Sequence, residues 1–163
     1  VASMNPCPCG YYNDPTHHCV CTPGQIQRYM NKISGPLLDR IDLHVSVMRP
    51  KYSELTATIQ GEPSCDIAKR VAEARAVQAE RLSRWHMQSN AQMGHRQLKE
   101  TCQLDAEGTE MLRVVFEKLH LSARSYDRII KVARTIADLA GSDQIRPEHV
   151  AEAISFRNMM NGK

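Results

Sequence analysis

Residues 122–141 read SARSYDRIIKVARTIADLAG, and this stretch decides most of the fold. Its apolar residues recur at the three- and four-residue spacing of one helix face: Tyr126, Ile129, Ala133, Ile136 and Ala140. Ser122 is a typical N-cap and Gly141 a typical stop, so the pattern predicts a helix over 122–140. The basic residues form a second stripe, which is predicted to face outward from a bundle: Arg124, Arg128 and Lys131.

Further helices are predicted on both sides of this stretch. Ser64 suits the start of a helix that runs to about Arg84, with these residues on its buried face: Ile67, Val71, Ala74, Leu82 and Trp85. A short helix is expected over 95–102, another from Asp105, and a last one opening at Pro147. Residues 64–163 are therefore expected to form an all-α bundle.

The first third of the chain has a different pattern. VASM at 1–4 resembles the end of a strand, a helix is predicted over 25–33, and apolar residues alternate with polar ones over 41–48 in strand fashion. We interpret residues 1–51 as an α/β remnant, a strand, a helix and a strand. The polar stretch 52–63, bounded by prolines, is expected to be a linker to the helical domain.

Composition narrows the class of protein. The 163 residues are 42% hydrophobic and 24% charged, with a formal net charge of +3, and no apolar run approaches the roughly 18 to 20 residues of a membrane span. We expect a soluble protein without membrane association. The chain starts without Met, without a secretory signal and inside a strand, so we expect a fragment, monomeric by itself. Its clustered cysteines do not resemble the spread cysteines of a disulfide-stapled secreted domain, so a reducing cytoplasm is expected.

Residues 5–21, NPCPCGYYNDPTHHCVC, concentrate metal-binding chemistry in one irregular loop. Four thiolates are the ligand set of closed, tetrahedral zinc sites, and the candidate ligands are Cys7, Cys9, Cys19 and Cys21. A structural zinc is the favoured interpretation, in which His17 or His18 could replace one thiolate. Reduced thiols or an adventitious disulfide are the alternative. A catalytic zinc is disfavoured, since four protein ligands leave no position for water.

Three strings resemble one family: VASMNPCPCGYY at 1–12, CTPGQIQRYMNKISGPLLDRIDLHV at 21–45 and HLSARSYDRIIKVARTIADLAG at 120–141. They are similar to the C-terminal part of the magnesium-chelatase-like AAA+ ATPases of the competence ComM (YifB) group. The resemblance implies the end of an AAA+ α/β core followed by a helical lid. It covers nearly the whole chain.

The resemblance also implies site residues. Asn5 matches the sensor 1 position, which helps to place the attacking water, and Arg40 in LLDRID matches the arginine finger that reaches a neighbouring subunit's ATP. Arg124 matches the sensor 2 arginine of the lid, acting on its own or the adjoining subunit's nucleotide. The sequence has no G-x-x-x-x-G-K-[ST] and no apolar strand ending in Asp-Glu, so we expect the phosphate-binding half to lie upstream and the chain alone to be inactive.

The expected function follows from this resemblance. It implies a hexameric ATPase that uses ATP and Mg²⁺ to remodel DNA, as a branch-migrating helicase in recombination and natural transformation. Lid motion about 52–63 would be the mechanical step. One alternative is a magnesium-chelatase-type ATPase that remodels a protein partner. Another is a stand-alone zinc-binding interaction module without ATPase activity.

Overall fold

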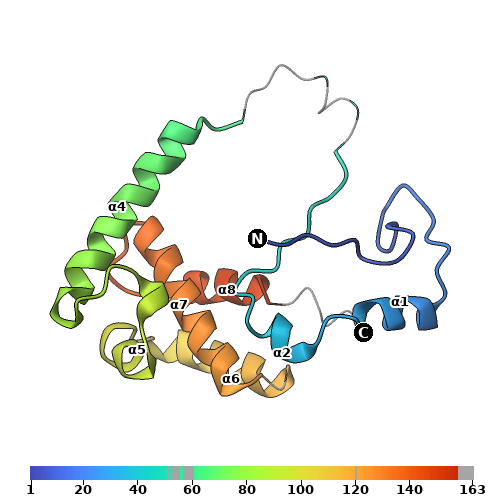
Figure 1. Cartoon of the computed structure of the whole chain (residues 1–163). Coiled ribbons are helices and arrows are strands. Elements are labelled where there is room, and N and C mark those ends of the chain that lie inside the picture. Colours follow the sequence, from blue (N-terminus) through green and yellow to red (C-terminus); the bar gives the residue numbers. More distant parts are fainter. Residues whose placement is uncertain (51, 53–55, 57–60, 120, 158–163) are drawn as a thin grey trace. The chain divides into compact units, whose positions relative to one another are not determined.

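The computed structural model describes residues 1–50, 52, 56, 61–119 and 121–157 (Figure 1). The chain divides into two compact units, one of residues 1–41 with 46–58 and the other of residues 42–45 with 59–163. Most of the predicted linker, 52–63, lies outside the described residues.

The larger unit is helical, as predicted for the C-terminal part of the chain. Its helices are α4 (Ser64–Leu82), α5 (His95–Thr101), α6 (Ala106–Lys118), α7 (Ala123–Leu139) and α8 (Pro147–Ser155), with short 3-10 turns η1 (Ser83–Trp85) and η2 (Asn90–Gln92). Helix α7 is central, because it contacts α4, α5, η2 and α8 (Figure 1). The expected helices at 95–102, after Asp105, after Ser122 and from Pro147 are confirmed.

Local sequence sets the ends of α7. The Ser122 hydroxyl accepts a hydrogen bond from the Ser125 N–H at 3.1 Å, which satisfies one of the free donors of the first turn. At the other end Gly141 has a φ of 65°, a left-handed conformation that suits glycine, and the helix stops there. Ile129 and Ala133 of the predicted apolar face are both 1% exposed and lie in the core.

The basic stripe of α7 is exposed at Arg124 and partly exposed at its other two residues, which have partners elsewhere in the chain. Arg128 forms an ion pair with Asp42, with 2.6 Å between Nη1 and Oδ1, and the Lys131 ammonium donates to the Ala91 carbonyl at 3.3 Å. Arg124 is exposed as expected. These partners come from segments distant in sequence, which periodicity within one helix does not predict.

The predicted buried face of α4 is only half buried. Ala74 and Leu82 are 4% and 0% exposed, whereas Ile67 and Val71 remain 41% and 44% exposed. Figure 1 shows the reason, since the first turns of α4 extend beyond the other helices of this unit. An apolar stripe is buried only where a neighbouring element lies against it.

A buried polar cluster joins α4, η2 and α7. The Asp138 carboxylate, whose side chain is 0% exposed, accepts two hydrogen bonds from Arg81, both at 2.7 Å. It also accepts from Arg134 at 3.0 Å and from the Asn90 amide at 2.8 Å. Arg134 also donates to the carbonyls of Ser142 and Asp143 in the α7–α8 loop. The cluster therefore ties three elements and one loop together through a single carboxylate.

The smaller unit contains α1 (Pro23–Met30) and α2 (Gly35–Leu38), so the helix predicted over 25–33 exists with earlier bounds. The strands predicted at 1–4 and 41–48 are not formed in these described residues, and the strand–helix–strand remnant is not shown. Leu43, Val45 and Val47 are 49%, 63% and 89% exposed. A strand needs a ladder of backbone hydrogen bonds to a neighbouring segment. The His44 N–H donates to the Phe156 carbonyl at 3.0 Å, but the described residues of neither segment form such a ladder.

Candidate metal centre and nucleotide-sensing residues

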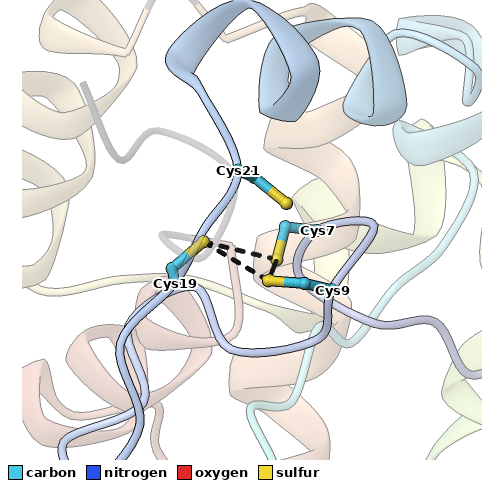
Figure 2. A group of neighbouring side chains, drawn as sticks. All are labelled: Cys7, Cys9, Cys19 and Cys21. Atoms are coloured by element: carbon cyan, nitrogen blue, oxygen red, sulfur yellow. Dashed lines mark hydrogen bonds between the residues drawn. The ribbon is translucent and has the colours of Figure 1, made fainter.

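The four cysteines of the loop lie together in the smaller unit, with their side chains pointing toward one another: Cys7, Cys9, Cys19 and Cys21 (Figure 2). All four Sγ atoms lie within 4.8 Å of one another. Three of the sulfur–sulfur distances are 3.4, 3.7 and 3.6 Å. A tetrahedral zinc with Zn–S bonds of about 2.3 Å requires about 3.8 Å between sulfurs. The donor set and its spacing therefore fit zinc.

The backbone explains how two Cys-x-Cys pairs meet. The Gly10 N–H donates to the Cys7 carbonyl at 3.1 Å, which closes a turn directly after the first pair. Gly10 has a φ of 84°, which side-chain-bearing residues rarely adopt. The second pair returns along the loop just before α1, whose N-cap is Thr22. Cys7 is 0% exposed and the other three thiols are half-buried.

The electrostatics of the cluster favour a bound cation. The backbone N–H of Tyr11 is the main cause that lowers the pKa of Cys9 to about 6. Burial, and after it the neighbouring sulfurs, raise the pKa of Cys21 to about 12. Crowded thiols resist full deprotonation because their negative charges repel, and a divalent cation would offset that repulsion.

The histidines of the loop are not part of this ligand cluster. In the part of the chain that the structure describes, the potential metal ligands that converge within 4.8 Å are the four cysteines. His17 instead stacks on Tyr11, with ring centroids 4.9 Å apart and planes 15° from parallel. The alternative in which His17 or His18 replaces a thiolate is therefore disfavoured.

Asn5 lies at the entrance of the cysteine loop. It is exposed, and a side chain added at Gly10 would meet the Asn5 amide nitrogen at 3.8 Å. The turn that positions Cys7 and Cys9 thus also lies against Asn5. Any metal that orders this turn would help to hold the Asn5 amide in place.

Arg40 follows α2 directly. Its N–H donates to the Leu37 carbonyl at 3.0 Å, so its backbone is held in the turn that ends the helix while its side chain is exposed. Arg40 belongs to the smaller unit and Arg124 to the larger. The structure therefore assembles the four cysteines, and it does not place the two arginines relative to each other.

Arg124 lies in the first turn of α7 and lines an open hollow of about 680 Å³. Phe116 and Tyr126 form an edge-to-face pair in its wall, with centroids 6.1 Å apart. His95 and Asp127 also line it and form a hydrogen bond of 2.9 Å. Sequence reasoning missed this pair, because its partners are 32 residues apart and no local pattern connects them. The hollow combines aromatic surface with a cationic side chain.

Comparison with known families identifies the chain. Residues 61–157 match the family model described as magnesium chelatase, subunit ChlI C-terminal, and residues 1–55 match the model for magnesium chelatase, subunit ChlI. The chain belongs to the magnesium chelatase ChlI C-terminal family. The resemblance seen in the sequence is thereby confirmed.

Curated relatives place the chain more closely within this magnesium-chelatase-like family. It is 40% identical over 161 residues to competence protein ComM of Haemophilus influenzae, and 40% identical over 158 residues to uncharacterized protein YifB of Escherichia coli. An uncharacterized protein of Mycobacterium tuberculosis is 36% identical over 157 residues. These alignments cover 96–98% of the chain but only about 30% of each relative.

The described helices do not meet the requirements of a membrane span. In the described residues, none of the helices has both the length and the apolar character needed to cross a bilayer.

Proposed function

We propose that the chain supplies the sensing and trans-acting part of a hexameric AAA+ ATPase that couples ATP hydrolysis to remodelling of DNA. The observation that carries this proposal is the match to both parts of the magnesium chelatase subunit, residues 1–55 and 61–157. Similarity to a competence protein supports DNA rather than a porphyrin-related partner. Because the matched relatives are about three times longer than the aligned region, they have room for the phosphate-binding motifs that this sequence lacks.

Three residues would act on the nucleotide. Arg40, exposed at a turn, would present its guanidinium to the transferring phosphoryl group on a neighbouring subunit, where charge develops in the transition state. Asn5 would orient the attacking water. Arg124 would contact the phosphates from the lid, and the aromatic wall of its hollow would exclude water from them.

Magnesium would neutralise the phosphate charge in the complete enzyme. The sequence contains no acidic pair after an apolar strand to hold it, so no step of the reaction is assigned to a magnesium ligand of this chain. The contribution of this chain is positioning and transition-state charge stabilisation.

The cysteine cluster would hold a structural zinc. The loop has little core of its own, since Cys7 is its one fully buried residue among those described. Metal binding would supply folding free energy that the loop cannot obtain by burying apolar surface. The bound ion would order the loop next to Asn5 and so stabilise the position of this sensor 1 residue.

Zinc content tests this role directly. The purified chain is expected to contain one zinc per molecule, and chelation should release four additional thiols to a colorimetric thiol reagent. Cys65 is exposed and should react before chelation, whereas Cys102, 5% exposed in the core, should react only on unfolding. Metal-free protein with four freely reactive loop thiols would contradict the assignment.

DNA stimulation separates the proposed function from its main rival. The complete ATPase is expected to hydrolyse ATP several-fold faster with branched or single-stranded DNA than without it. Stimulation only by a protein partner would favour a chelatase-type remodelling role, which the family name itself supports. Absence of any ATPase activity in the complete protein would leave a zinc-binding interaction module.

A further inference from the structure

Two rings of the cysteine loop contact each other, and a cation from a distant part of the sequence lies over one of them. Tyr11 lies parallel to His17, with ring centroids 4.9 Å apart. The guanidinium carbon of Arg49 lies 5.3 Å from the centroid of the same Tyr11 ring. Tyr11 thus contacts both His17 and Arg49, and the three side chains form an aromatic and cationic stack within the smaller unit.

The His17 end of this stack is open. Tyr11 covers one face of the imidazole, yet the His17 side chain remains 49% exposed. Its other face is therefore accessible to solvent. The neighbouring Tyr12 is also exposed, at 37%. Exposed planar rings at the tip of an ordered loop offer a surface for another flat group.

The loop backbone holds His17 in place. The Asp14 carboxylate accepts hydrogen bonds from the N–H groups of Thr16 and His17 at 2.7 and 3.0 Å. The Thr16 hydroxyl lies 3.0 Å from His17 Nδ1. The imidazole is thus oriented before any ligand arrives, so little conformational entropy would be lost on stacking.

Charge around the stack suits a polyanion. Residues 15–38 contain no Asp or Glu, and Asp14 is the one acidic residue before them. Its carboxylate accepts the hydrogen bonds of the turn and lies 3.9 Å from His17 Nδ1, so it is the one negative charge beside the imidazole among the described residues. Arg49, in contact with the Tyr11 ring, adds positive charge at the stack, and the same unit contains Arg28 and Lys32. A zinc tetrathiolate would itself be negative, so attraction to phosphate would come from these side chains and not from the metal.

We propose that the Arg49–Tyr11–His17 stack is a binding site for single-stranded DNA, on which a base stacks against the open face of His17. Aromatic stacking combined with nearby cations is the usual mode of sequence-tolerant single-strand binding. A duplex keeps its bases stacked on each other and cannot offer a free base face. This inference rests on the proposed DNA-remodelling function and assigns a contact point to it.

The test measures binding of a fluorescently labelled oligothymidine by anisotropy, together with DNA-stimulated ATP hydrolysis of the complete protein. His17→Ala is expected to weaken oligothymidine binding about five- to tenfold, the lower range for loss of one stacked base. It should raise the DNA concentration for half-maximal stimulation by a similar factor and leave the rate without DNA unchanged. His17→Phe keeps a planar ring and should restore binding.

His18→Ala is the matched control, because His18 is an exposed neighbouring histidine outside the described ring stacks. Zinc content of each variant reports whether the loop remains intact. The stacking site would be overturned if His17→Ala bound oligothymidine like the wild type, or if both alanine variants lost binding equally. Either result would leave the proposed DNA-dependent ATP hydrolysis intact. A wild-type protein that neither binds nor responds to any DNA would instead remove the proposed function.

Discussion

Arg40→Ala in the complete ATPase is expected to lower the rate of ATP turnover by about 10³-fold or more and to leave nucleotide binding nearly unchanged. A guanidinium that reaches a neighbouring active site acts on charge that develops in the transition state, so its loss affects turnover more than ground-state affinity. Steady-state hydrolysis and titration with a fluorescent ATP analogue measure the two quantities separately.

Two variants sharpen this test. Arg40→Lys keeps the charge but not the planar fork, and should recover little activity. Arg75→Ala removes an exposed arginine of α4 and should hydrolyse ATP at the wild-type rate. If Arg40 acts in trans, mixing variant with wild-type subunits should reduce activity more steeply than simple dilution. Parallel losses of binding and turnover would make Arg40 a structural residue.

Asp138→Ala is expected to lower the free energy of unfolding of the helical unit by about 3–5 kcal/mol. The substitution leaves Arg81 and Arg134 without the carboxylate that both contact, and Arg134 is only 2% exposed. An uncompensated buried charge is costly because the low-dielectric interior does not solvate it. The single Trp, Trp85, packs against the core of this unit, so its fluorescence reports urea unfolding.

Glu117→Ala provides the control for an ion pair of the same type at the surface. Glu117 pairs with Arg113 at 2.7 Å, but its side chain is 62% exposed, and its removal should cost at most about 1 kcal/mol. Asp138→Asn keeps the shape and one acceptor, so its loss of unfolding free energy should lie between those of Asp138→Ala and Glu117→Ala. It replaces Asp138→Ala in the comparison if that variant does not accumulate as folded protein. Similar midpoints for Asp138→Ala and Glu117→Ala would show that the buried cluster contributes little to stability.

The helices and the grouping of the four cysteines were predictable because their signals are local. Ser122 and Gly141 mark the ends of α7 through backbone geometry that each residue favours by itself. The clustering of Cys7 with Cys19 was likewise predictable from composition, since paired thiols in a loop without a core have few other uses. The helical unit and the cysteine cluster could therefore be predicted before any coordinates were known.

The strands and the surface charges were not predictable in the same way. The alternation at 41–48 indicates a capacity to pair, but pairing needs a second extended segment. Among the described residues, the backbone contact of this stretch is with Phe156, directly after α8, and no ladder forms. Arg128 and Lys131 have the spacing of a solvent-facing stripe, yet their partners lie at Asp42 and Ala91. His95 and Asp127 meet for the same reason, through packing of α5 against α7.

The sequence by itself determined where the helices begin and end, which residues can bind a metal, and the family, because these depend on side-chain chemistry and short-range spacing. Only the tertiary structure decided which polar groups are buried. Asp138 is exposed or buried according to whether Arg81 and Asn90, 57 and 48 residues earlier, are brought to it. Burial of a charge is a property of the whole packed unit, since each partner must offset the desolvation of the others.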